Sequence, residues 1–250
     1  MSSMVELKNI NISYHTTAGE TKAVSDLSFS VEQGEFVCIV GPSGCGKSSI
    51  LSMLAGLIKP SSGSFHIHSK TNIGYMLQKD YLLEWRNIRS NACLGLEIQK
   101  KLTPENIKRV DELLELYGLG DFKNHMPSQL SGGMRQRVAL IRTLAIQPDV
   151  LLLDEPFSAL DYQTRLYVSD EIGTIIRKEK KTAILVSHDI SEAISLSDRV
   201  IVLSHRPATL KSIYTIDLSI AERTPIKARE APEFKDYFNK IWKELDVHVS

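Results

Sequence analysis

Residues 4–14 and 22–31 alternate apolar and polar residues, which is the pattern of β-strands that bury one face, and residues 36–40 are continuously apolar, as in a buried strand. The alternation slips by one position near Asn9. Between the strand-like stretches lies one apolar segment long enough to be a helix, and Gly56 and Pro60 stand where it is expected to stop. The pattern predicts a helix over about 47–57 and strands over 4–14, 22–31, 35–40, 64–68 and 71–77.

Helical periodicity dominates from about residue 88 to residue 147. Thr103 and Pro104 form a typical helix start, a capping residue followed by proline in the first turn. The apolar residues that follow recur at helical spacing, so they share one face of the helix. We therefore expect a helical insertion in an α/β protein, with one such face formed by Val110, Leu113, Leu114 and Tyr117.

Strands and helices alternate again after residue 149, an order that predicts a parallel sheet covered by helices on both faces. A last helix is expected near the end of the chain, where Phe234, Phe238, Ile241, Trp242 and Leu245 recur on one face. Mixed charges on its other faces favour docking on the protein core over binding to a membrane. The predicted strands are 150–154, 182–187 and 199–204, and the predicted helices are 161–179 and 190–197.

The composition is that of an ordinary soluble globular protein, with 42% hydrophobic and 24% charged residues. The 30 basic and 30 acidic residues balance, so no basic excess points to nucleic acid. Cys38, Cys45 and Cys93 form no CxxC pair, which favours reduced thiols over a zinc site or disulfides. Neither an apolar signal core nor a run of about 18 apolar residues is present, so any role at a membrane is expected to depend on partners.

A glycine-rich loop lies between the strand predicted over 35–40 and the helix that follows it. It matches the phosphate-binding pattern Gly-x-x-x-x-Gly-Lys-Ser/Thr, which arises by chance in roughly 1% of random chains of this length. In such a loop the backbone wraps around phosphate, and the amide groups at the helix N-terminus face the anion. Lys47 is expected to reach the β- and γ-phosphates of ATP and Ser48 to bind Mg²⁺. The predicted nucleotide-binding residues here are Gly41, Pro42, Ser43, Gly44, Cys45, Gly46, Lys47, Ser48 and Ser49.

Two carboxylates stand at the end of the strand predicted over 150–154. An aspartate at such a strand end is suited to hold phosphate-bound Mg²⁺, the role expected of Asp154. Glu155 is then placed to polarise the attacking water as a general base. Helix caps also produce acidic pairs, but after a phosphate-binding loop the pair indicates a nucleotide-hydrolysing site.

Residues 130–137 read Leu-Ser-Gly-Gly-Met-Arg-Gln-Arg, which resembles the signature of the ATP-binding-cassette (ABC) ATPases. The same stretch also reads as the start of a helix capped by Ser131, and a helix N-terminus is itself an anion site. Further ABC motifs follow the family's order along the whole chain: Gln78 of the Q-loop, Asp161 in the D-loop segment 158–161, the switch histidine His188, and Tyr14 at the position of the aromatic that stacks on adenine.

This resemblance implies a single ABC ATPase domain over residues 1–250, a P-loop NTPase (RecA-like) core with an N-terminal antiparallel β subdomain and an inserted α-helical subdomain. The core with its β subdomain is expected at about 1–87 and 148–230, the helical subdomain at about 88–147, and the C-terminal helix at about 231–245. The family works as a head-to-tail dimer that closes on two ATP molecules.

In such a dimer Ser131, Gly132 and Gly133 would act on the partner's nucleotide. His188 would contact the γ-phosphate, and Gln78 would couple Mg²⁺ to a transmembrane partner. The resemblance thus implies ATP and Mg²⁺, a second copy of the cassette, permease subunits, a separate solute-binding protein and no nucleic acid. It also implies a peripheral position on the cytoplasmic side of the cell membrane.

Residues 79–88, after Gln78, resemble the Leu-Leu-Pro-Trp segment of importer ATPases for nitrate, taurine and aliphatic sulfonates, with Glu84 in place of the proline. The tail over 231–249 resembles the same subfamily. We therefore expect an importer ATPase. Leu82, Leu83 and Trp85 are expected either to line the groove for a coupling helix or to pack inside the helical subdomain.

Other classes of protein fit less well. An exporter ATPase has the same motifs and stays the nearest alternative. Non-transport ABC proteins usually carry two cassettes, a long coiled-coil insertion or zinc-binding cysteines, and none of these is expected here. A module that binds ATP without hydrolysing it is disfavoured by the intact set of Lys47, Asp154, Glu155 and His188.

Overall fold

The computed structural model describes residues 3–17, 19–68, 71–220 and 224–245. The end of the subfamily-like tail, residues 246–249, lies outside these ranges. Tertiary contacts divide the chain into two compact units, and each is described by itself below. The first unit is Met1–Thr71 with Ser169–Ser250, and the second is Asn72–Val168.

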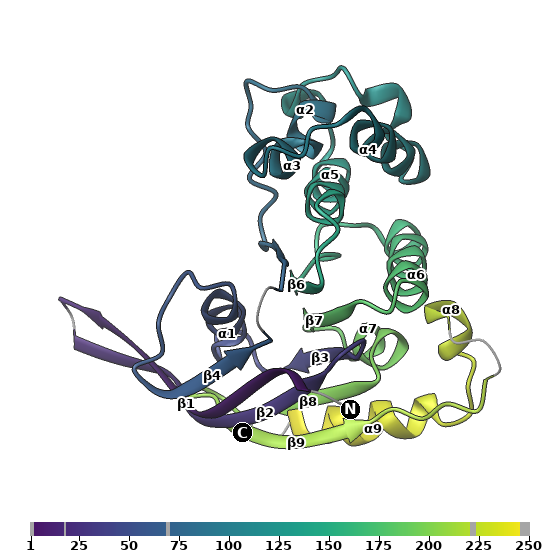
Figure 1. Cartoon of the computed structure of the whole chain (residues 1–250). Helices are drawn as coiled ribbons and strands as arrows, with labels where there is room; N and C mark the ends of the chain where they lie inside the picture. The colour runs from purple at the N-terminus through teal and green to yellow at the C-terminus, as the bar shows by residue number, and fades with distance from the viewer. Residues whose placement is uncertain (1–2, 18, 69–70, 221–223, 246–250) are drawn as a thin grey trace. The chain divides into compact units, whose positions relative to one another are not determined.

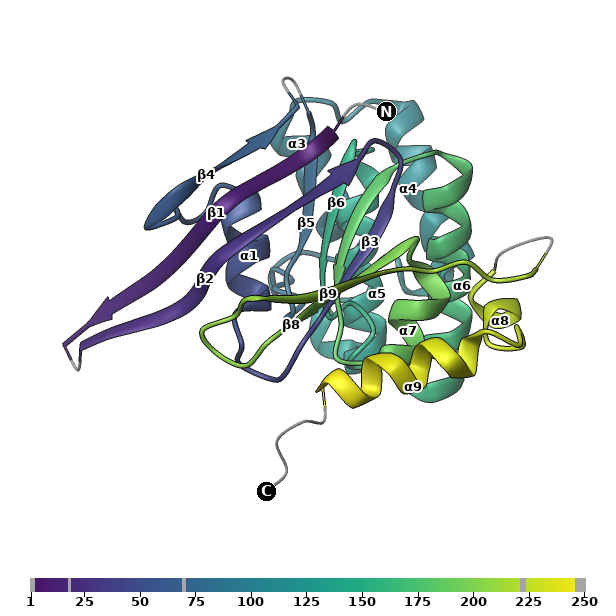
Figure 2. The same cartoon turned by 90° about the horizontal axis from the view of Figure 1, so that it is seen from below.

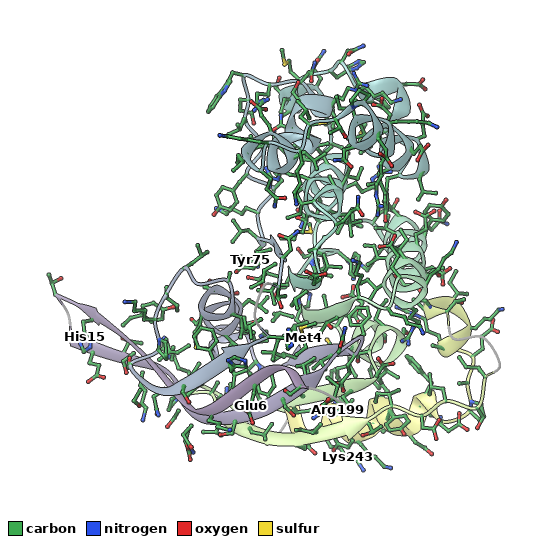
Figure 3. All side chains as sticks on the ribbon, viewed as in Figure 1. Met4, Glu6, His15, Tyr75, Arg199 and Lys243 are labelled. Carbon is green, nitrogen blue, oxygen red and sulfur yellow. The ribbon has the colours of Figure 1, made fainter. Side chains whose placement is uncertain are left out.

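An antiparallel sheet begins the first unit, in the order β2-β1-β4. Figure 2 shows β1 and β2 as two long strands side by side, and His15 lies near the far end of this pair in Figure 3. The phase slip expected near Asn9 is confirmed, because the register between β1 and β2 shifts there and Asn9 takes a positive φ of 49°. The Asn9 amide donates to Asp26 at 2.7 Å and fixes the irregularity. The strands are β1 (Ser3–Thr16), β2 (Gly19–Glu32) and β4 (Ser62–Ile67).

A second sheet in this unit has the order β7-β3-β8-β9. The strands β7, β3 and β8 run parallel, and all residues of β3 and β7 are buried, as expected for strands covered on both faces. The parallel pairing expected for the predicted strands is confirmed, and the sheet has one further edge strand that the sequence did not predict, β9, which pairs antiparallel with β8. The connection between β8 and β9 is too short for a parallel crossover, which needs a dozen or more residues. The strands are β3 (Phe36–Val40), β7 (Thr182–Val186), β8 (Arg199–Leu203) and β9 (Leu210–Thr215).

Short helices accompany these strands. The segment predicted as a helix over 47–57 forms α1 (Lys47–Leu54), and the residues around 190–197 form α7 (Ile190–Leu196). Helix α7 packs on β3 and β8 (Figure 1), and α8 (Pro225–Ala228) packs on α7. The apolar residues of α7 are buried, so this helix is part of the core that supports the ends of the parallel strands.

The C-terminal helix α9 (Phe234–Leu245) packs on α7 and β8, which confirms the expected docking on the core. Its buried face is narrower than expected. Ile241 is fully buried, whereas Trp242 is half exposed and stacks on Phe238 with ring centroids 6.0 Å apart. Lys243 points away from the sheet (Figure 3), and Glu244 accepts hydrogen bonds from Ser212 and Tyr214 of β9. Both hydrogen bonds and apolar contacts therefore hold the end of the described chain.

The second unit contains the parallel pair β5 (Ile73–Met76) and β6 (Val150–Asp154) and a group of helices. The long helix α5 packs on its neighbours and on β5, and the predicted α4 face is buried at Val110, Leu114 and Tyr117. Helix α6 (Tyr162–Lys178) begins in this unit and ends in the first. The other helices are α2 (Ile88–Ala92), α3 (Leu94–Ile98), α4 (Pro104–Leu116), η1 (Gly120–Phe122), η2 (Pro127–Gln129) and α5 (Gly132–Ala145).

Within the described ranges of the chain, no helix has both the length and the apolar character that crossing a membrane requires.

Candidate functional site

The glycine-rich loop joins β3 to α1 in the first unit, as the sequence pattern requires. Gly44 and Gly46 have φ values of 72° and 124°, a region that favours glycine. A Cβ on Gly46 would also lie 2.9 Å from the carbonyl oxygen of Ala23, so a larger residue cannot fit without a shift of the backbone. Gly46 is the N-cap of α1 and has no side chain to occupy the first amide groups. These amides can therefore face an anion.

Lys47 is the charged group of this loop, and only 6% of it is exposed. Its Nζ donates hydrogen bonds to the carbonyl oxygens of Gly41 at 2.7 Å and Pro42 at 3.0 Å. The ammonium group is thus held over the loop by two neutral acceptors. Phosphate oxygens are stronger acceptors for a charged donor, so the lysine can exchange these carbonyls for a bound phosphate.

Tyr14 of β1 lies next to the first turn of α1. Its hydroxyl group donates to Oγ of Ser49 at 2.9 Å, and 41% of the residue is exposed. This hydrogen bond joins β1 to the helix that follows the phosphate-binding loop, although the two residues are 35 positions apart in the sequence. Ser48, the predicted magnesium ligand, is exposed in the same turn.

His188 follows β7 and lies beside the start of the loop. It lines one surface pocket together with Gly41, Pro42 and Ser43, and α9 contributes Trp242 and Leu245 to the same pocket. The first unit thus brings together two motifs that are about 140 residues apart in the sequence. Hydrogen bonds hold the residues on both sides of His188, because Ser187 donates to the buried Glu192 at 2.7 Å and Asp189 caps α7.

In the second unit, β6 ends at Asp154, which is 3% exposed. Glu155 follows with a φ of 47°, a left-handed conformation that is unfavourable for a residue with a side chain. Nε2 of Gln78 donates to Oε2 of Glu155 at 3.1 Å. The unit therefore brings the Q-loop glutamine and the predicted base together, a contact that the sequence did not predict.

The side chains predicted for Mg²⁺ are those of Ser48, Gln78 and Asp154. They offer a hydroxyl, an amide carbonyl and a carboxylate, the hard oxygen donors that this ion prefers. Among the described residues, no group of three or more His, Cys, Asp or Glu could hold a metal ion by itself. In proteins Mg²⁺ keeps several waters and is bound through one or two carboxylates together with substrate phosphates, and the carboxylate of Asp154 is of that kind.

The signature stretch begins α5 with Ser131 as its N-cap, and Oγ of Ser131 accepts a hydrogen bond from the Met134 amide at 3.3 Å. A Cβ on Gly132 would meet open space, whereas one on Gly133 would lie 3.1 Å from the Leu160 side chain. The signature and the D-loop segment are thus neighbours within this unit. Asp161 caps α6 through the amide of Thr164, and hydrogen bonds with Thr164 lower the pKa of its carboxyl.

Sequence reasoning missed a network of charged and amide side chains that ties the Q-loop to α5. Arg135 pairs with both Asp80 and Glu84, and Arg142 donates to backbone carbonyls of the loop. The partners are about 50 or more residues apart, so no local periodicity indicates them. The one available signal was Glu84, a charged residue where the importer ATPases that the segment resembles have proline.

Cys45 and the other two cysteines are free thiols, as expected. Cys45 is 1% exposed, and burial raises the pKa of its thiol although the nearby Lys47 acts in the opposite direction. The thiol therefore fills space under the loop as a neutral group.

Comparison with known proteins places these motifs in a family. The family model of ABC transporters matches residues 24–158. The ABC transporter ATP-binding protein YtlC of Bacillus subtilis is 45% identical over 98% of this chain and 96% of its own length. Two import proteins are each 36% identical: the nitrate import ATP-binding protein NrtD of Synechocystis, over 95% of this chain and 93% of its own, and the aliphatic sulfonates import ATP-binding protein SsuB of Bacillus licheniformis, over 91% and 89%.

Among solved structures, a dimeric post-hydrolysis state of the ATP-binding cassette MJ0796, bound to ADP and Pi, has a TM-score of 0.78. It is 30% identical, and the match covers 86% of this chain and 99% of that chain. This likeness confirms the predicted α/β fold with a P-loop NTPase core. The chain therefore belongs to the ABC transporter family, in which it is an ATP-binding and ATP-hydrolysing cassette.

Proposed function

We propose that this protein is the ATP-hydrolysing subunit of an ABC importer that takes up a small solute of the nitrate, sulfonate or taurine type through a separate membrane permease. The observation that carries the catalytic part is the pairing of Gln78 with Glu155 at 3.1 Å. The importer part is supported by the 36% identity to the nitrate and aliphatic sulfonates import proteins and by the segment after Gln78.

The first unit supplies phosphate binding in this proposal. ATP places its phosphates at the N-terminus of α1, where the backbone amides donate hydrogen bonds to phosphate oxygens. Lys47 exchanges its contacts with the carbonyl oxygens of Gly41 and Pro42 for contacts with the same phosphates. Tyr14 stacks on the adenine ring. To do so, the tyrosine either breaks its hydrogen bond with Ser49 or turns its phenol ring while keeping that bond. His188, beside the loop, donates to the γ-phosphate.

The second unit supplies the base. Glu155 accepts a proton from the attacking water, and the hydrogen bond from Gln78 keeps the carboxylate in one orientation. Ser48, Asp154 and Gln78 would hold Mg²⁺, which when bound neutralises charge on the β- and γ-phosphate oxygens. We propose that both sets of residues act on the same ATP molecule, because hydrolysis requires phosphate binding, charge neutralisation and a positioned water together.

A second copy of the cassette completes the site. Ser131, Gly132 and Gly133 begin a 14-residue helix whose amide groups suit the γ-phosphate of a nucleotide bound by the partner. The open space beside Gly132 leaves its backbone accessible to such a ligand. Structures of the similar cassette MJ0796 are dimeric, which supports the pairing of two cassettes.

The permease contact is assigned to the segment after Gln78. Leu82 is 6% exposed and packs within the second unit, whereas Trp85 is 77% exposed and Tyr81 is 58% exposed. Aromatic side chains of this size are common anchors of protein interfaces. We therefore propose that Tyr81 and Trp85 receive a cytoplasmic helix of the permease, which places the protein at the cytoplasmic side of the membrane.

Affinity purification from gently solubilised native membranes tests the proposal, with mass spectrometry of the proteins that co-purify. A multi-span permease together with a solute-binding protein is the expected result. A permease with no binding protein, even after mild cross-linking, would favour export. If only proteins without membrane spans co-purified while other transporter complexes survived the extraction, the transport role would be abandoned and the ATPase activity retained.

A further inference from the structure

Three charged side chains join the loop after Gln78 to the first turn of α5. Nε and Nη2 of Arg135 donate to the two carboxylate oxygens of Asp80, each at 3.0 Å. Nη1 of the same guanidinium pairs with Glu84 at 2.9 Å. One arginine thus holds two carboxylates from the same loop, four residues apart. We call Asp80, Glu84 and Arg135 the Arg135 clamp.

Other residues of α5 hold the backbone of the same loop. Arg142 donates to the carbonyl oxygens of Asp80 at 2.7 Å and Tyr81 at 3.0 Å. Nε2 of Gln136 donates to the carbonyl oxygen of Gln78 at 3.4 Å. Helix α5 therefore holds the start of the loop through several hydrogen bonds, and the clamp supplies the charged part of that connection. Asn91 of α2 holds the backbone of the same loop at Leu83.

The geometry of the clamp suits a firm connection. The Arg135 and Asp80 side chains are only 25% and 22% exposed, and their contact is bidentate, which fixes orientation as well as distance. Burial by itself would raise the pKa of Asp80, but the hydrogen bond from Arg135 and the amide of Leu82 outweigh it and keep that pKa below its ordinary range. Asp80 therefore stays ionised at neutral pH, and the pair is charged under working conditions.

Both ends of the clamp adjoin residues with roles in the proposed function. On the loop side, Asp80 is two residues from Gln78, whose side chain donates to Glu155. On the helix side, Arg135 is two residues from Gly133 of the signature. Glu84 precedes the exposed Trp85. A displacement of the loop at Trp85 would therefore be transmitted to the signature helix and to the Gln78 side chain together.

We propose that Arg135 is a positioning residue that sets the rate of ATP hydrolysis by holding Gln78 beside Glu155 through the Arg135 clamp. This inference rests on the roles of Gln78 and Glu155 under the proposed function. The second carboxylate is a property of this chain, because the Leu-Leu-Pro-Trp segment that it resembles has proline at position 84. Glu84 thus adds a second charged contact that a proline cannot make.

The test compares two arginines of the same unit in the full-length protein. Arg135→Gln breaks the clamp. Arg89→Gln is the matched control, since the guanidinium of Arg89 makes its bidentate ion pair with Asp111 of α4 and not with a carboxylate of the loop. With Mg²⁺ and ATP, we expect Arg135→Gln to lower kcat by roughly threefold to tenfold with KM changed less than twofold, and Glu84→Gln to give a smaller loss. Arg89→Gln is expected to retain the parent kcat, even if both arginine variants lower the melting temperature equally.

A double-mutant cycle separates positioning from a general loss of stability. Gln78→Ala is made alone and together with Arg135→Gln. If Arg135 acts through Gln78, the second substitution adds no further loss of kcat once Gln78 is gone. Independent losses that multiply, or an Arg135→Gln variant with the parent kcat, would overturn the inference while leaving Gln78 its role. An unchanged kcat for Gln78→Ala alone would overturn the role of Gln78 itself, and the positioning inference with it.

Discussion

The side-chain amide of Gln78 donates a hydrogen bond to Oε2 of Glu155 at 3.1 Å, across 77 residues of sequence. The glutamine stands just after the short strand β5, and the glutamate stands just after the parallel neighbour β6. Parallel strands end at the same edge of a sheet, so two loops that follow them meet. Under the proposed function, the hydrogen bond joins the Q-loop to the carboxylate that accepts the proton of the attacking water.

Glu155→Gln is expected to slow ATP hydrolysis about 100-fold or more, because a positioned general base contributes about 10²–10⁴-fold to such a reaction. The amide keeps the size of the side chain, so ATP should still bind and the dimer should remain closed on it. Phosphate release and size-exclusion chromatography in ATP measure the two effects. Glu112→Gln, which removes an exposed carboxylate in the same unit, serves as the control. Unchanged turnover in Glu155→Gln would remove Glu155 from the role of base.

Tyr14→Ala is expected to weaken ATP binding by roughly fivefold or more, since stacking on a base contributes about 1–3 kcal/mol. Tyr14→Phe keeps the ring and loses only the hydrogen bond to Ser49, so its affinity should stay within about twofold of the parent. Isothermal titration calorimetry with ATP measures both. Inorganic triphosphate provides an internal control because it has no base to stack. If Tyr14→Ala weakened binding of triphosphate as much as binding of ATP, the ring would support the loop and not the adenine.

Cys45 is expected to react slowly with iodoacetamide at pH 7 and faster as the pH rises. The thiolate is the reactive form, and burial raises the pKa of this thiol, so little thiolate is present at neutral pH. Burial raises the pKa of Cys38 and Cys93 as well, so the three sites are distinguished by peptide mapping. Bound ATP should slow the labelling of Cys45 further, and this effect should be larger at Cys45 than at Cys93. Rapid labelling of Cys45 in the folded protein at pH 7 would contradict this account.

Trp85→Ala is expected to reduce the amount of permease that co-purifies with the protein several-fold, because a large exposed aromatic residue is the typical anchor of an interface. The chain offers a matched control in its other tryptophan. Trp242 is 51% exposed on α9, in the other unit, and Trp242→Ala should leave the co-purified permease unchanged. Equal losses in both variants would indicate a general effect on the fold. Equal recovery in both would exclude Trp85 from the contact.

Much of this structure follows from local patterns. The loop around Lys47, the strand ending in Asp154 and the capped start of α5 each rest on neighbours in sequence, so periodicity and motif spacing indicate them. The irregularity at Asn9 was visible as a slip in alternation. By contrast, the residues of the edge strand β9 alternate between half-buried and exposed. A strand that buries so little does not require a strong hydrophobic pattern in its sequence.

Side-chain pairs between distant segments were not predictable in the same way. The contact of Arg135 with Asp80 spans 55 residues, and that of Tyr14 with Ser49 spans 35. Such pairs leave no period in the sequence, because each residue taken alone reads as an ordinary surface charge or aromatic. The outward position of Trp242 had the same origin, since helical spacing predicts a shared face and not which edge of that face the core covers.

If Glu155 is the base that the proposed function assigns, its left-handed backbone makes folding and catalysis favour different residues at this position. A residue with a side chain at such a φ costs about 1–2 kcal/mol relative to glycine. Replacement by glycine is therefore expected to make the protein harder to unfold while abolishing its turnover. Engineering for heat tolerance alone would select this substitution and yield a more robust protein without activity. Any stabilised version of this cassette should keep position 155 fixed and seek its gains elsewhere.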